Sequence, residues 1–139
     1  LLFLFQRKHL IIIMPRNGRS ENSMGTKKEV ASKAYEVTVS SNALHNIDEI
    51  TGYVAFINHQ PGNAIKIGDA IFSLIERIGK NPLAFKECGE IPTKTKMYRQ
   101  AKCLAWLLIY RVTGNTILIL GIIHAARKPL RIKQLKRIK

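Results

Sequence analysis

The C-terminal third of this 139-residue chain contains no acidic side chain. Residues 91–139 include twelve lysines and arginines but neither aspartate nor glutamate, whereas residues 35–90 carry four basic and seven acidic side chains. The net charge of +14 is therefore concentrated toward the end of the chain. This asymmetry favours an anionic partner (a nucleic acid, an acidic protein segment or a membrane surface) over a solvated basic tail on an ordinary domain.

Long apolar runs are also missing. The apolar stretches 1–5 and 10–14 are separated by Gln6-Arg7-Lys8-His9, whereas a spanning helix needs about 20 continuous apolar residues. A secretory signal would place its basic residues before the apolar run and small residues at a cleavage site, and neither feature is present. We therefore expect no membrane partner.

Cysteine is scarce. Cys88 and Cys103 are the two cysteines, and they form neither a metal-ligand spacing nor a disulfide framework. This usage fits a reduced, cytoplasmic setting with two inert thiols. We expect no metal and no cofactor.

The first 33 residues differ in composition from the rest of the chain. The stretch "PRNGRSENS" is polar and rich in turn formers, as linkers are. We expect residues 1–33 to lie outside the fold as a disordered or mis-started segment, with Met14 or Met24 as the natural initiator. The rival interpretation of this segment is an amphipathic surface anchor.

Residues 34–139 predict one domain, because 46% of the chain is hydrophobic, as in globular proteins. "YEVTV" alternates as a half-buried strand does, and Ser40-Ser41-Asn42 offers a helix N-cap. Apolar residues at helical spacing follow in 44–57 and again in 64–78, separated by "NHQPGN". Pro61 can open the second helix, so a helical hairpin is predicted.

After the loop that contains "KECGEIPTK", the period returns to two. Residues 97–103 and 104–112 are predicted strands, and Gly114-Asn115 is a two-residue hairpin signal before "TILILGII". The predicted fold is α+β, a single β-α-α-β-β-β domain with an antiparallel sheet packed against the helical hairpin. A basic C-terminal tail follows, in which Leu130 or Ile132, Leu135 and Ile138 line one side of a short helix unless the terminus is frayed.

The order of these elements resembles the ParE/RelE superfamily of bacterial toxins from type II toxin–antitoxin modules. The matching stretches are "YEVTVSSNA", Asn81-Pro82, "WLLIYRV" and "ILGIIHAAR", and the resemblance covers roughly residues 35–132. It implies a toxin that is neutralised by a cognate antitoxin, in a toxin–antitoxin hetero-oligomer.

One branch of the superfamily resembles RelE, a ribosome-dependent messenger ribonuclease that uses basic side chains on its sheet. The arginine that this branch carries after the aromatic opening its third strand is here Leu107, next to Trp106, and its two lysine positions fall at Tyr98 and Gln100. Only the last arginine has a match. A ribonuclease would have to use the basic residues Lys94, Lys96, Arg99, Lys102 and Arg127, with ribosome-bound messenger as substrate.

The other branch resembles ParE, which poisons DNA gyrase and commonly ends its last strand with a histidine followed by an arginine, as in "IIHAAR" here. The resemblance implies that His124 and Arg127, with Lys128 and Arg131 in the basic tail, bind the target. Structural alternatives are a histidine that caps the strand end and a solvated surface arginine. We therefore predict a gyrase-directed toxin, with no confident catalytic residue. The alternatives are the ribonuclease and a degenerate, non-toxic nucleic-acid-binding relative.

Overall fold

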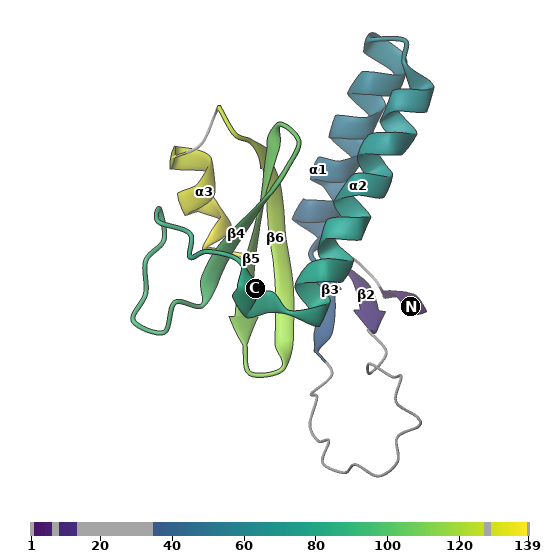
Figure 1. Cartoon of the computed structure of the whole chain (residues 1–139). Helices are drawn as coiled ribbons and strands as arrows, with labels where there is room; N and C mark the ends of the chain where they lie inside the picture. The colour runs from purple at the N-terminus through teal and green to yellow at the C-terminus, as the bar shows by residue number, and fades with distance from the viewer. Residues whose placement is uncertain (1, 7–8, 14–34, 127–128, 139) are drawn as a thin grey trace.

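A computed structural model describes residues 2–6, 9–13, 35–126 and 129–138, and their side chains within 35–126 and 132–138. Figure 1 shows a sheet with a long helical hairpin on one side and a short helix on the other. In chain order the strands and helices are β1 (Leu2–Gln6), β2 (His9–Ile13), β3 (Glu36–Val39), α1 (Ser41–Gly52), η2 (Tyr53–Ile57), α2 (Pro61–Lys80), η3 (Pro82–Ala84), β4 (Tyr98–Cys103), β5 (Trp106–Thr113), β6 (Thr116–His124) and α3 (Pro129–Leu135).

The helical hairpin begins where the sequence predicts. Ser40 is the N-cap of α1, and its hydroxyl oxygen accepts a hydrogen bond from the Ala43 N–H at 3.1 Å, which satisfies one of the free donors of the first turn. α1 continues without a break into the π-helical turn η2. Pro61 is the first residue of α2, as expected, because its fixed φ suits that position.

One side of α2 forms most of the helical contribution to the core. Ile67, Ile71, Leu74 and Ile78 recur at helical spacing and are buried with Val37 and the strands β4–β6. Such burial contributes on the order of 1.5–3 kcal/mol for each large aliphatic side chain. The packing confirms the predicted helical hairpin over the sheet.

Strands β4, β5 and β6 form an antiparallel meander in which Gly114 takes a φ of 60° at the turn between β5 and β6. A positive φ at the first central residue matches the twist of a hairpin and suits glycine. The register shifts by one residue at Ile109/Tyr110, opposite Leu120. This bulge determines which main-chain groups in the second half of β6 face the helices.

The strand order is β1-β2-β3-β6-β5-β4, and β3 runs parallel to β6. The sequence predicted an antiparallel sheet, which is correct for β4–β6 but not for the pairing of β3. The reason is the connection, because the helical hairpin carries the chain from β3 to the far edge of the sheet. The predicted α+β class and β-α-α-β-β-β order are confirmed by the elements from β3 to β6.

The second face of the sheet is covered by α3 and the loop before β4. Ile132 and Leu135 of α3 are buried against Ile109, Leu118 and Ile123. Arg111 also donates a hydrogen bond to the Ile138 carbonyl at 3.2 Å. The predicted apolar side of the C-terminal helix is therefore part of the core, and its basic residues Lys133, Lys136 and Arg137 are exposed.

The sheet extends beyond β3 through an N-terminal hairpin. β2 pairs antiparallel with β3, from Leu10 opposite Val39 to Ile13 opposite Glu36, and β1 pairs with β2. No strand was expected in residues 1–33, because Gln6-Arg7-Lys8-His9 was interpreted as a break in an apolar run rather than as a turn. That the domain does not depend on this hairpin for its stability stays a prediction.

Candidate target-binding site

His124 is the last residue of β6 and the one proposed target-binding residue whose side chain is described. Its imidazole is exposed, and its Nδ1 accepts a hydrogen bond from the Ala126 N–H at 3.1 Å. The ring meets the Trp106 indole edge-on, with centroids 6.1 Å apart. His124 therefore caps the strand end, as the structural alternative expected, while it remains open to solvent.

The other predicted target-binding residues are less defined. Arg127 and Lys128 lie outside the described residues, and Arg131 falls in α3 without a described side chain. The described chain resumes at Pro129, so α3 follows closely after the end of β6. The predicted roles of Arg127, Lys128 and Arg131 remain proposals.

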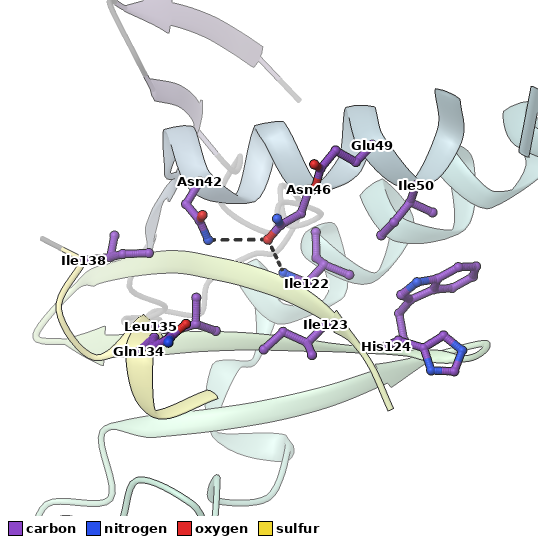
Figure 2. A pocket seen from close by; sticks show the side chains of 11 residues that line it. Asn42, Asn46, Glu49, Ile50, Ile122, Ile123, His124, Gln134, Leu135 and Ile138 are labelled. Atoms are coloured by element: carbon purple, nitrogen blue, oxygen red, sulfur yellow. Dashed lines mark hydrogen bonds between the residues drawn. The ribbon is translucent and has the colours of Figure 1, made fainter. Parts of the chain in front are cut away.

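A groove runs beside His124 between α1, β6 and α3. Figure 2 shows its lining side chains, which converge on a hollow of about 550 Å³. A second hollow of about 670 Å³ shares Glu49, Ile50, Trp106 and His124 and continues to Tyr53 and Val54. The two form one groove, defined here by Asn42, Asn46, Glu49, Ile50, Tyr53, Val54, Trp106, Ile122, Ile123, His124, Ala126, Gln134, Leu135 and Ile138.

Helix α1 holds one wall of the groove against the strand through side-chain amides. The Asn46 Oδ1 accepts a hydrogen bond from the Ile122 N–H at 3.0 Å (Figure 2). The Asn42 Nδ2 donates to the Leu120 carbonyl at 3.0 Å. Gly121 lies beneath these amides, where a Cβ atom would approach Leu135 Cδ2 to 2.8 Å and Asn42 Nδ2 to 2.9 Å. The wall is therefore tightly fixed.

The alternative ribonuclease residues do not converge. Arg99 and Lys102 are three residues apart on β4, so they lie on opposite faces of the sheet. Lys94 and Lys96 belong to the loop before β4. Lys102 is exposed opposite Leu107, beside a hollow of about 520 Å³ that is also lined by Lys86 and Gln100. Arg127 lies outside the described residues.

Arg99 has a structural role. Its guanidinium donates to the Phe85 carbonyl at 2.7 Å and to the Leu83 carbonyl at 3.4 Å, which ties η3 to β4. The neighbouring Tyr110 hydroxyl donates to the Pro82 carbonyl. Burial raises the pKa of Tyr110 well above its usual value, and this effect outweighs the opposing effect of the nearby Arg99 charge. In this structure Tyr110 is therefore a buried hydrogen-bond donor that holds η3 against β5.

Two further observations concern the described residues. No group of three or more histidine, cysteine, aspartate or glutamate side chains gathers there as a metal site would require. No helix in the described part of the chain is long and apolar enough to cross a membrane.

Sequence reasoning missed most of the groove. The sequence did not mark Glu49 as a site residue, and Trp106 entered only as the aromatic residue next to Leu107. Asn42 and Asn46, four residues apart on one helix, were a possible signal, because amides at this spacing project from the same side. Their acceptor and donor on β6 are 78 and 76 residues away in sequence.

Comparisons with known proteins identify the fold's relatives. The family model described as the ParE toxin of the type II toxin–antitoxin system parDE matches residues 37–129, which is more than half of the chain. A solved structure of the chromosomal ParDE toxin–antitoxin system from P. aeruginosa is 21% identical, covers 62% of this chain and 90% of its own, and superposes with a TM-score of 0.48. A search of curated proteins found no match. On the strength of the family model, the chain belongs to the ParE toxin family of type II toxin–antitoxin systems.

Proposed function

We propose that this toxin acts by inhibiting DNA gyrase and that a cognate antitoxin neutralises it. Family membership supports the class of toxin. The choice of gyrase rests on the site, since a gyrase-directed toxin needs a complementary surface and no catalytic set. The groove beside His124 at the end of β6 is the candidate for that surface, and Arg127, Lys128 and Arg131 are proposed to bind the target with it.

The observation that carries this proposal is Leu107, an apolar residue at the position where the resembled ribonuclease branch has an arginine. Leu107 pairs with Lys102 on β4 and with Ile123 on β6. A cleaved phosphate acquires extra negative charge in its transition state, and loss of one well-placed stabilising group costs on the order of 2.7–4 kcal/mol. Arg99 lies on the other face of the sheet, where its guanidinium is engaged by the Leu83 and Phe85 carbonyls.

The antitoxin partner follows from the parDE family. An acidic antitoxin segment that folds on binding complements residues 91–139, which contain no competing acidic side chain. Such an encounter is steered by long-range charge, so its rate falls as salt is added. We place this toxin–antitoxin complex in the cytoplasm, in keeping with the two free, buried thiols.

Induced expression with two parallel readouts tests the proposal. We expect filamentous growth and DNA breaks trapped on gyrase, with messenger RNA intact. Arg127→Ala should relieve toxicity more than Lys94→Ala or Lys96→Ala, because Arg127 is a proposed target-binding residue, whereas Lys94 and Lys96 belong to the loop before β4. Cleavage of ribosome-bound messengers within codons, with gyrase unaffected, would replace this proposal by the ribonuclease.

A further inference from the structure

The second half of β6 has a main-chain edge that no described strand covers. β3 pairs with β6 only as far as Val39 opposite Ile119, because Ser40 begins the turn into α1. The side chains of Ser40 and Asn42 then donate to the Leu120 carbonyl, and Asn46 accepts from the Ile122 N–H. In the described part of the chain, α1 makes no hydrogen bond to β6 beyond Ile122.

The register defines where the uncovered groups point. The Ala125 N–H donates to the Ala105 carbonyl at 2.8 Å, so residue 125 faces β5. Because antiparallel pairs alternate between bonded and non-bonded positions, Ile122 and His124 direct their main-chain groups away from β5. The Ile122 carbonyl and the His124 N–H therefore face the groove, at the spacing at which an added strand would pair.

Apolar side chains continue the groove from this edge onto the tip of the helical hairpin. Ile50, Trp106 and Tyr53 line it. Beyond them, Phe56 is 76% exposed and Ile57 is 62% exposed. Exposed apolar residues near an unpaired strand edge are typical of protein-binding surfaces.

The charge of the groove indicates which kind of segment binds there. Glu49 is the one carboxylate that lines the groove, and no described lining residue is lysine or arginine, although the chain has 23 of these against nine acidic residues. Glu49 also lies 3.3 Å from His45 on the exposed face of α1, a surface pair that is easily exchanged for another partner. The groove therefore favours a neutral or cationic segment, whereas an acidic antitoxin segment suits residues 91–139.

We propose that an extended segment of the toxin's target adds as a short strand to the Ile122–His124 edge of β6. Its main chain bonds the Ile122 carbonyl and the His124 N–H, an apolar side chain packs against Trp106, and a cationic side chain faces Glu49. The inference rests on the proposed function, in which that target is gyrase. It adds how the target is held and assigns this groove to the target rather than to the antitoxin.

The charge of the groove provides the first test. The full chain and its Glu49→Lys variant are titrated against the two purified gyrase subunits, with Asp48→Lys as the matched control. Asp48 is the adjacent exposed residue of α1 and does not line the groove. We expect Glu49→Lys to weaken binding at least about tenfold, as loss of a charge-assisted contact does, and Asp48→Lys to leave it nearly unchanged.

The main chain provides the second test. His124→Ala and His124→Pro both remove the imidazole, but only proline also removes the N–H that faces the groove. We expect His124→Pro to bind gyrase about tenfold more weakly than His124→Ala. Hydrogen exchange on the unmodified chain supplies a readout without substitution, and the His124 amide should become protected when gyrase binds.

Each failure has a separate meaning. If gyrase binds but Glu49→Lys behaves like Asp48→Lys and the His124 amide stays unprotected, the inference is wrong and the proposed function stands. If Glu49→Lys weakens the cognate antitoxin rather than gyrase, the groove belongs to the antitoxin and the inference is again wrong. If neither gyrase subunit binds the unmodified chain, the proposed function is wrong, and the inference that rests on it is wrong as well.

Discussion

Asn46 on α1 accepts a hydrogen bond from the main-chain N–H of Ile122 on β6 at 3.0 Å. Together with the Asn42–Leu120 bond, this contact joins the helical hairpin to the strand that ends at His124, at the point where β3 no longer covers β6. It also fixes one wall of the groove next to the proposed target-binding residues. The stability of the fold and the shape of the site are therefore coupled through the same side chain.

Replacing Asn46 by alanine is expected to lower the free energy of unfolding by about 1–3 kcal/mol, because Ile122 is buried and its N–H would lose its partner. Asn42→Ala is the matched control and should cost less, since the Leu120 carbonyl keeps the Ser40 hydroxyl. Chemical denaturation of both variants measures the difference. Equal losses would show that the Asn46 bond has no special weight.

Gly121→Ala is expected to destabilise the domain by about 1–3 kcal/mol, because the new methyl group would press on Leu135 and Asn42. The readout is the thermal midpoint. Gly52→Ala is the control, since nothing lies within 4 Å of its added Cβ atom and alanine favours helix. A Gly121→Ala protein as stable as Gly52→Ala would contradict the close packing of α3 on β6.

The free energy of unfolding is expected to fall in alkaline solution. Burial raises the folded-state pKa of Tyr110 above its usual 10.0, and that of Cys88 and Cys103 above 9.0. For groups whose folded pKa is raised, stability is complete below the unfolded pKa and is lost as the pH rises above it. Denaturant titrations from pH 7 to 11 should thus show a decline beginning near pH 9.

Tyr110→Phe separates the Tyr110 contribution from that of the thiols. The variant should be less stable at pH 7 by about 1 kcal/mol, because it loses the bond to the Pro82 carbonyl. It should also show a shallower decline above pH 10, since one buried ionisable group is gone. An unchanged alkaline slope would mean that Tyr110 does not contribute to it.

Deleting residues 1–23 is expected to leave the thermal midpoint and antitoxin affinity nearly unchanged. β3 retains β6 as its partner, and Val37 and Val39 of β3 are fully buried in the core with α2 and β6. A fall in midpoint of more than about 5 °C, roughly 1 kcal/mol for a domain of this size, would show instead that the β1–β2 hairpin stabilises the sheet.

Antitoxin association is expected to slow steeply as salt increases, because an acidic segment meets the basic residues of 91–139. Stopped-flow association rates at low and high ionic strength measure this dependence. Rates that remain flat would indicate a largely uncharged encounter.

The local elements of the fold could be predicted because their signals are short in range. Ser40 caps α1, Pro61 opens α2, and Gly114 turns the β5–β6 hairpin, each through its own backbone preference. The end of α2 has a less reliable signal, since Gly79, a residue type that commonly follows a helix, is buried within it and Asn81 is the C-cap. There tertiary packing prevailed over the usual capping preference of glycine.

The groove could not be predicted, because it depends on contacts between distant segments. The Ile109/Tyr110 register shift reverses which residues of β6 face α1, and nothing in the alternation of "TILILGIIH" reveals it. The π-helical turn at Tyr53–Ile57 was likewise hidden, since Val54 and Ile57 fit ordinary helical spacing. Periodicity identifies a buried face, but it does not show where two elements stop covering each other.

The supercoiling reaction of purified gyrase, run with increasing amounts of the purified chain, tests the central claim most directly. We predict loss of supercoiling together with double-strand breaks trapped on gyrase, reversed by the cognate antitoxin and reduced by Arg127→Ala. Unimpaired supercoiling without trapped breaks, from a chain that still binds its antitoxin, would contradict the proposal that this toxin acts on gyrase.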